Sequence, residues 1–305
     1  MIDLSPAYRR MVKTNWGKEG EEWLAQIPEL LSKYSNIFDL RDLRLCGNLS
    51  YNLVLSGECL KYGSVIVKIG LPDNGVLNEM IALEAYNGKL ACKCHFSDKK
   101  DRVMILERLI PGETLHKIKD RLKRVEIFAQ TANDLMIEDP ENQRLPLYGE
   151  VLARAFQKAD NDSDKYKELI GQIRQAEKFY REITEAKLPK YLLHGDLHHG
   201  NILSCKEGWK AIDPHGFIGE RIVEAARFME NEIAIEELSE SNIREVIDLT
   251  SKYYREDKDK LARVLFIDHI LTGCWNIEEN CSEEERRRDM AMADCIIAII
   301  ANNRY

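Results

Sequence analysis

The chain has no long hydrophobic run and no excess of positive charge. Its longest strongly apolar stretch, residues 295–301, is far shorter than the roughly 20 residues that a membrane-spanning helix needs. The formal net charge is -8 at pH 7, whereas a nucleic-acid-binding protein needs basic patches that neutralise phosphates. We therefore expect neither a membrane nor a nucleic acid as a partner.

An export signal and a regular cysteine framework are also missing. Residues 1–6 carry neither a basic leader nor an apolar segment, so we expect a cytoplasmic protein. The 8 cysteines are scattered, which favours reduced thiols that pack in the interior. Residues 92–95 read Cys-Lys-Cys-His, but no second Cys/His pair follows at the spacing of zinc ligands. No protein partner is evident.

What is present is the composition of a globular protein with two lobes. The chain has 305 residues, 44% of them hydrophobic and 31% charged. Apolar alternation predicts strands within residues 43–70 and over 103–109, with helices near 5–35 and over 76–87. After Pro111 the periodicity is helical, and helices are expected over residues 115–137, 150–187, 221–238, 243–254, 259–276 and 282–302. This pattern divides the chain into a strand-rich part, residues 1–110, and a helical part, residues 111–305.

The most informative segment is residues 194–203, His-Gly-Asp-Leu-His-His-Gly-Asn-Ile-Leu. Asp196 and Asn201 are separated by the same interval as the base and the metal-binding Asn of kinase catalytic loops. Residues 210–214 then read as a short buried strand that ends in the carboxylate of Asp213. Phosphoryl transfer needs a carboxylate near the acceptor hydroxyl and oxygen ligands that hold Mg²⁺ on the phosphates of ATP. We therefore predict Asp196 as the catalytic base, with Asn201 and Asp213 as metal ligands.

Lys68 is out of place in the apolar strand 64–69 unless its ammonium group has a buried partner. Together with the downstream loop, it is predicted to hold the α- and β-phosphates of ATP, with Glu79 of the next helix as its partner. Glu84 points to a different face of that helix. The alternative for Lys68 is a stem that crosses apolar surface while the ammonium group reaches water.

Further nucleotide contacts are predicted from position alone. Ser50 lies in a turn between two strands and is expected to donate to the β-phosphate. The turn has one glycine rather than three, so it fits an ordinary hairpin equally well. Glu107 and Leu109 lead into Pro111-Gly112, and we expect their backbone groups to pair with adenine.

Two rival interpretations remain. The cluster His194, Asp196, His198 and His199 could ligate the zinc of a metallohydrolase. That model leaves the strand lysine and both predicted magnesium ligands unexplained, so we expect His194 and His198 to hold the loop in shape through hydrogen bonds. A nucleotide-binding pseudokinase is the second rival, but it would normally lack one of the three motif residues, and all are present.

These segments resemble the aminoglycoside phosphotransferase-type kinases, whose loop commonly reads His-Gly-Asp-Leu-His-Pro-Gly-Asn-Ile-Leu. Residues 23–31, 106–112, 212–219 and 274–279 are similar, more narrowly, to the streptomycin 6-kinase and hydroxyurea-resistance kinase branch. The chain departs from the pattern at His199, where the family often has Pro, and at His215, where the branch often has Lys. The expected fold is α+β and protein-kinase-like, with two lobes: an antiparallel sheet with a pairing helix, and a helical C-terminal lobe.

The resemblance implies transfer of the γ-phosphoryl group of ATP or GTP, with Mg²⁺, to a hydroxyl of a small molecule. We expect an aminoglycoside such as streptomycin and hence antibiotic resistance; the alternative is a housekeeping amino alcohol or sugar metabolite. Residues 1–110 would hold the nucleotide, and residues 111–305 the catalytic loop and the acceptor. A cationic acceptor needs carboxylates, for which the candidates are Glu224, Asp268, Glu278 and Glu279. Each of them also fits a solvated helix face.

Overall fold

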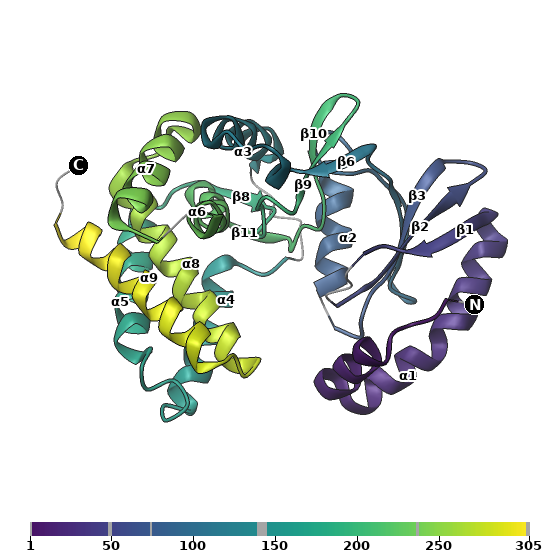
Figure 1. Cartoon of the computed structure of the whole chain (residues 1–305), viewed down its shortest axis with the longest axis horizontal. Helices are drawn as coiled ribbons and strands as arrows, with labels where there is room; N and C mark the ends of the chain where they lie inside the picture. Colours follow the sequence, from purple (N-terminus) through teal and green to yellow (C-terminus); the bar gives the residue numbers. More distant parts are fainter. Residues whose placement is uncertain (1, 48–50, 74, 139–144, 236–237, 303–305) are drawn as a thin grey trace. The chain divides into compact units, whose positions relative to one another are not determined.

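The computed structural model describes residues 2–47, 51–73, 75–138, 145–235 and 238–302 (Figure 1). The chain divides into two compact units. Unit 1 comprises Met1–Gly112 and Ser204–His215, and unit 2 comprises Glu113–Leu203 and Gly216–Tyr305. Asp213 therefore belongs to the same unit as Lys68, although it follows the catalytic-loop motif in the sequence.

Unit 1 contains a five-stranded sheet with the strand order β1-β2-β3-β5-β4. All of its neighbouring strands are antiparallel, as the sequence predicted. The strands are β1 (Leu40–Leu45), β2 (Leu53–Cys59), β3 (Gly63–Ile69), β4 (Cys94–Asp98) and β5 (Val103–Glu107), and helix α2 (Gly75–Tyr86) follows β3. Buried and less buried residues alternate along β2, which gives this strand one face toward the core.

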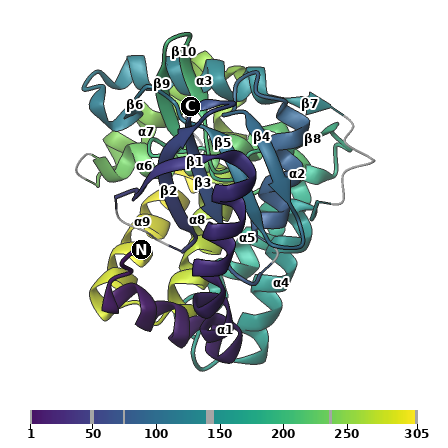
Figure 2. The same cartoon turned by 90° about the vertical axis from the view of Figure 1, so that its right-hand side faces the viewer.

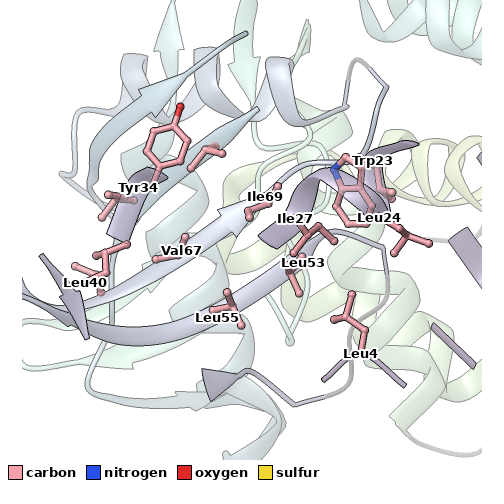
Figure 3. Packing of buried hydrophobic residues seen from close by; sticks show 14 of the residues in the cluster. Leu4, Trp23, Leu24, Ile27, Tyr34, Leu40, Leu53, Leu55, Val67 and Ile69 are labelled. Carbon is pink, nitrogen blue, oxygen red and sulfur yellow. The ribbon is translucent and has the colours of Figure 1, made fainter. Parts of the chain in front are cut away.

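Helix α1 (Pro6–Phe38) lies across one face of this sheet (Figure 2). Its first turn is capped by Ser5, whose hydroxyl accepts from the Tyr8 amide, and Pro6 occupies an early position where a missing N–H costs nothing. Buried side chains of the helix pack against apolar side chains of β2 and β3 (Figure 3). The Trp23 indole also donates to the Gly70 carbonyl at 2.6 Å, just after β3. The helix thus fixes the strand that carries Lys68.

Unit 2 is helical around a small antiparallel sheet of order β11-β8-β7. Its helices are α3 (Arg121–Leu135), α4 (Tyr148–Asn161), α5 (Ile170–Thr184), α6 (Glu224–Ile235), α7 (Glu240–Thr250), α8 (Lys258–Glu278) and α9 (Glu283–Ala301), and the strands are β7 (Ile137–Glu138), β8 (Lys190–Leu193) and β11 (Phe217–Glu220). A further sheet has the order β10-β9-β6, from β6 (Pro111–Thr114), β9 (Ile202–Cys205) and β10 (Gly208–Ala211); β10 belongs to unit 1, and the unit boundaries fall within β6 and β9. Helices α8 and α9 lie side by side (Figure 1). No helix in the described ranges is both long and apolar enough to cross a membrane.

The single helix predicted over residues 150–187 is wrong. The chain forms α4 and α5 with a break between them, which begins at the sequence Asn-Asp-Ser-Asp, residues 161–164. Side chains of Asn, Asp and Ser compete for backbone hydrogen bonds and so favour helix ends over helix interiors. The predicted helix over residues 115–137 likewise begins late, because Asp120 caps α3 at the Leu122 amide.

Candidate active site

Lys68 lies on β3 between two carboxylates of unit 1. Its Nζ is 2.6 Å from Glu79 Oε2, and it also pairs with Asp213. The expected pair with Glu79 is therefore present, whereas Glu84 is exposed. Burial alone would lower the pKa of Lys68, which is 4% exposed, but the two carboxylates raise it above its ordinary value. The lysine is thus a fixed positive charge at the end of the strand.

Asp213 follows β10 in an unusual backbone conformation. Its φ is 63°, in the left-handed region that Asp tolerates better than most residues. The preceding strand end is fixed by two bonds, from the Ala211 amide to the Leu90 carbonyl at 2.7 Å and from the Cys92 amide to the Ala211 carbonyl at 2.8 Å. About half of the Asp213 side chain is exposed, in contrast to buried Glu79. Its carboxylate is therefore accessible to a ligand as well as to Lys68.

The residues predicted to contact adenine differ in which of their hydrogen-bonding groups already have partners. The Glu107 amide donates to the Lys93 carbonyl at 2.8 Å, and the Glu107 carboxylate binds the Lys93 amide and Lys210 Nζ, both at 3.0 Å. The N–H and the side chain of Glu107 are thus already engaged. Within the described ranges, the Leu109 amide has no hydrogen-bond acceptor. Ser50, the predicted β-phosphate contact, lies outside the described residues.

In unit 2 the catalytic-loop motif forms a compact hydrogen-bonded turn. Asn201 Nδ2 donates to the Asp196 carbonyl at 2.9 Å and to Asp196 Oδ2 at 3.0 Å. His198 Nε2 lies 3.5 Å from the same carboxylate. Gly195 has a φ of 77°, and a Cβ at this position would lie 2.5 Å from the Phe217 ring, so only glycine fits. The spacing of Asp196 and Asn201 therefore brings the predicted base and the amide of Asn201 together.

The two histidines expected to support the loop both do so through ring nitrogens. His194 Nδ1 accepts from the Asp196 amide at 3.3 Å, and His198 Nδ1 accepts from the Gly200 amide at 3.0 Å. Each ring thus bonds to the amide two residues further along the chain. These bonds hold the backbone on both sides of the proposed base.

Glu224 supports the loop rather than the acceptor. The expectation that it lines the acceptor site does not fit its surroundings, because the side chain is 3% exposed. Its two carboxylate oxygens accept from the His194 amide at 2.6 Å and from the Gly195 amide at 3.2 Å. Burial raises the pKa of Glu224 to about 7. It is the first residue of α6, so this helix anchors the loop directly.

A second anchor was not predicted from the sequence. His199 is fully buried and its Nε2 lies 2.7 Å from Glu232 Oε2. Glu232 also binds Arg124 through two nitrogens and Arg121 Nε at 3.1 Å. Burial lowers the pKa of His199, so its ring is neutral and donates to the carboxylate. A signal existed in the sequence, since Arg124 and Glu232 both fall among the apolar positions of their helices.

The remaining acceptor candidates occupy three different environments. Asp268 is 5% exposed, accepts from the Tyr148 hydroxyl at 3.2 Å, and lies 3.3 Å from Arg227 Nη2. Glu278 pairs with exposed Lys158 at 2.8 Å, and its own side chain is 31% exposed. Glu279 is exposed and lines a cavity of about 820 Å³ bordered by α6, α8 and α9.

No group of three or more His, Cys, Asp or Glu side chains is arranged to hold a metal ion in the part of the chain that the structure describes. The motif histidines instead bond to backbone amides and to Glu232, as described above. Their surroundings therefore give no support to the metallohydrolase alternative.

Fold and site together define a small-molecule kinase. Residues 61–280 match the family described as aminoglycoside/hydroxyurea antibiotic resistance kinase, and the chain belongs to this family. It is 25% identical over 207 residues to streptomycin 6-kinase of Streptomyces griseus, which covers 67% of each chain. It is 24% identical over 288 residues to hydroxyurea phosphotransferase of Kitasatospora aureofaciens, covering 92% of this chain and 82% of the relative.

A solved structure shows the same fold. The amicoumacin kinase hAmiN, in complex with AMP-PNP, Ca²⁺ and Ami, superposes with a TM-score of 0.64 at 16% identity and covers 96% of both chains. The predicted family and the predicted protein-kinase-like fold are thus confirmed. The protein is an ATP-dependent phosphotransferase that acts on a small molecule.

Proposed function

We propose that the protein transfers the γ-phosphoryl group of ATP to a hydroxyl of an aminoglycoside such as streptomycin. The observation that carries the chemistry is the pairing of Asp196 with Asn201 by two hydrogen bonds from one amide group. The activity named for the Streptomyces griseus relative supports the acceptor class. Antibiotic resistance would be the biological role.

In this mechanism Asp196 accepts, or orients, the proton of the acceptor hydroxyl. An ionised carboxylate within hydrogen-bond reach of the hydroxyl is what a general base requires. Because phosphoryl transfer depends mainly on positioning and charge stabilisation, the rigidity of the loop matters as much as its basicity. The hydrogen bonds that loop amides donate to the side chains of His194, His198 and Glu224 supply that rigidity.

The residues predicted to bind Mg²⁺ fit a hard cation. Asn201 uses its amide nitrogen toward Asp196, and within the described ranges its carbonyl oxygen has no hydrogen-bond partner. Asp213 offers a half-exposed carboxylate. Both are oxygen ligands of the type that Mg²⁺ prefers. When bound, the metal would neutralise charge on the β- and γ-phosphates.

The nucleotide contacts come from unit 1. Lys68, held by Glu79, would bind the α- and β-phosphates as a point charge. The Leu109 amide and the Glu107 carbonyl would pair with adenine, and Ser50 remains a predicted phosphate contact. The relative crystallised with AMP-PNP and Ca²⁺ supports a nucleoside triphosphate and a divalent cation as joint ligands. GTP is the alternative donor.

The test is a turnover assay on the purified protein with ATP and Mg²⁺. Streptomycin, other aminocyclitols, amino alcohols and simple sugars serve as acceptors, with ADP release measured and the phosphorylated product identified by mass spectrometry. We expect turnover with streptomycin or a close aminocyclitol. Turnover with an amino alcohol or sugar alone would replace the proposed acceptor by a housekeeping metabolite, and no turnover with any acceptor would contradict the proposed function.

A further inference from the structure

Arg227 of α6 is a buried guanidinium group beside the proposed base. Its Nε lies 3.6 Å from Asp196 Oδ1, and only 13% of its side chain is exposed. Its Nη1 donates to Thr272 Oγ1 at 2.7 Å and to Glu230 Oε2 at 3.1 Å. Its Nη2 lies 3.3 Å from Asp268 Oδ2. The far end of the guanidinium is thus held by partners on α6 and α8, none of which belongs to the catalytic loop.

Asp268, the main counter-charge on α8, is itself fixed. Its Oδ1 accepts from the Tyr148 hydroxyl of α4 at 3.2 Å, while Oδ2 faces Arg227. A carboxylate this deeply buried requires a cation or several donors, because an unpaired buried charge is strongly destabilising. Partners on α6 and α8 hold Arg227, and α4 holds Asp268 in turn, which leaves the guanidinium group little freedom.

The nitrogen that faces Asp196 has no competing acceptor. Across the described part of the chain, Arg227 Nε makes no hydrogen bond. At 3.6 Å it is beyond ordinary N–H···O length, but its charge acts on Asp196 at this distance. Catalytic contacts are often long without substrate and shorten in the reactive complex. Arg227 Nε is positioned to make such a contact.

The carboxylate of Asp196 is consequently held from two sides. Oδ1 faces Arg227, and Oδ2 accepts from Asn201 Nδ2 at 3.0 Å with His198 Nε2 at 3.5 Å. Contacts on both oxygens restrict rotation of the carboxyl group about its Cβ–Cγ bond. That rotation decides which lone pair meets the acceptor hydroxyl.

We propose that Arg227, anchored by Asp268, is a positioning residue that fixes the orientation of the Asp196 carboxylate for proton acceptance. This inference rests on the proposed function, since it assumes that Asp196 acts on an acceptor hydroxyl. It also reassigns Asp268, which holds Arg227 rather than contacting the acceptor. A misplacement of reacting groups by about 1 Å can lower a rate about 100-fold, so the expected effect is on kcat.

The experiment compares Arg227→Gln, Arg227→Lys and Asp268→Asn with the wild type, using the acceptor that gives turnover. We expect Arg227→Gln to lower kcat by about 30- to 100-fold. The acceptor KM and the dissociation constant of ATP should stay within about threefold, because neither ligand loses a contact. Arg227→Lys should recover part of the loss, and Asp268→Asn, which keeps the side-chain shape, should lower kcat in the same direction.

The matched control is Arg263→Gln, an arginine of α8 five residues before Asp268 that pairs instead with Glu182 and Asp259. The inference is overturned if wild-type protein is active and both Arg227 variants keep kcat within threefold of Arg263→Gln. It is also overturned if the Arg227 and Asp268 variants lose acceptor affinity instead of kcat. Wild-type protein without turnover would contradict the proposed function itself, and the inference with it.

Discussion

Replacement of Glu232 by glutamine tests the buried charge network behind the catalytic loop. Glu232 is fully buried, and its carboxylate is shared by Arg124, Arg121 and His199. Glutamine keeps the shape of the side chain but removes its charge. Both guanidinium groups then lose this carboxylate partner, although Arg121 keeps Glu245 at 2.7 Å, and an amide donor is placed among N–H donors.

The size of the effect can be estimated in two ways. Burial raises the pKa of Glu232, but hydrogen bonds from Arg124 and His199 outweigh this and lower it to about 2. Relative to an ordinary value of 4.5, this corresponds to about 3 kcal/mol of folding free energy at neutral pH. Breaking a buried ion pair by removing one partner costs about 3–5 kcal/mol. The two estimates agree.

The sign of the pH dependence follows from the direction of the shift. The pKa of Glu232 is lower in the folded than in the unfolded state, so its contribution is fully present above about pH 4.5. It is lost as the pH falls toward 2. The difference in stability between wild type and Glu232→Gln should therefore shrink in acid.

The assay is urea unfolding followed by circular dichroism. At pH 7 we expect Glu232→Gln to lower the free energy of unfolding by about 3 kcal/mol. The control is Glu240→Gln, since Glu240 is half-exposed and pairs with Arg244 one turn away on α7, where such pairs contribute about 0.5 kcal/mol. A loss in Glu232→Gln within about 1 kcal/mol of the control would refute the reasoning.

Three further predictions concern the nucleotide, the metal and the loop. Lys68→Met should weaken the binding of a fluorescent ATP analogue about tenfold or more, which corresponds to about 1.4 kcal/mol. The control Lys100→Met, at an exposed site, should leave the affinity unchanged. Equal affinities of the two variants would contradict the role of Lys68. Asp213→Asn should raise the Mg²⁺ concentration for half-maximal turnover about tenfold, because metal affinity depends on ligand charge. An unchanged half-maximal concentration would contradict the assignment of Asp213 as a metal ligand. Burial raises the pKa of Glu224 from 4.5 to about 7, so its ionisation destabilises the folded state. As the pH rises from 4.5 to about 7, the free energy of unfolding of the wild type should fall by about 3 kcal/mol relative to that of Glu224→Gln. Urea unfolding measures both free energies, and an equal pH dependence in the two proteins would contradict this prediction.

The parts of the site that local spacing determines could be predicted from the sequence. Asp196 and Asn201 share one turn, so their interval in the chain fixes their distance in space. Lys68 was recognisable because an ammonium group in an apolar strand needs a buried partner, and Glu79 is that partner. The antiparallel sheet could be predicted because alternating apolar residues and the glycines between them are also local features of the sequence.

The parts that depend on helix packing could not be predicted. Arg124 and Glu232 are 108 residues apart, and their pairing requires a particular packing of α3 against α6. Arg227 and Asp268 face each other only because α6 packs on α8. The same holds for Glu224, which the sequence suggested as an acceptor contact and which binds loop amides instead. Carboxylates on helices look alike in sequence whether they face solvent, substrate or backbone.

The central claim is that Asp196 acts on the acceptor hydroxyl during phosphoryl transfer, and the Asp196→Asn variant tests it most directly. Asparagine keeps an oxygen that can accept from Asn201, so the loop should retain its shape. We predict that kcat falls by about 10²–10⁴-fold while the dissociation constant of ATP stays within about threefold. Turnover near the wild-type rate, with nucleotide binding intact, would contradict the account.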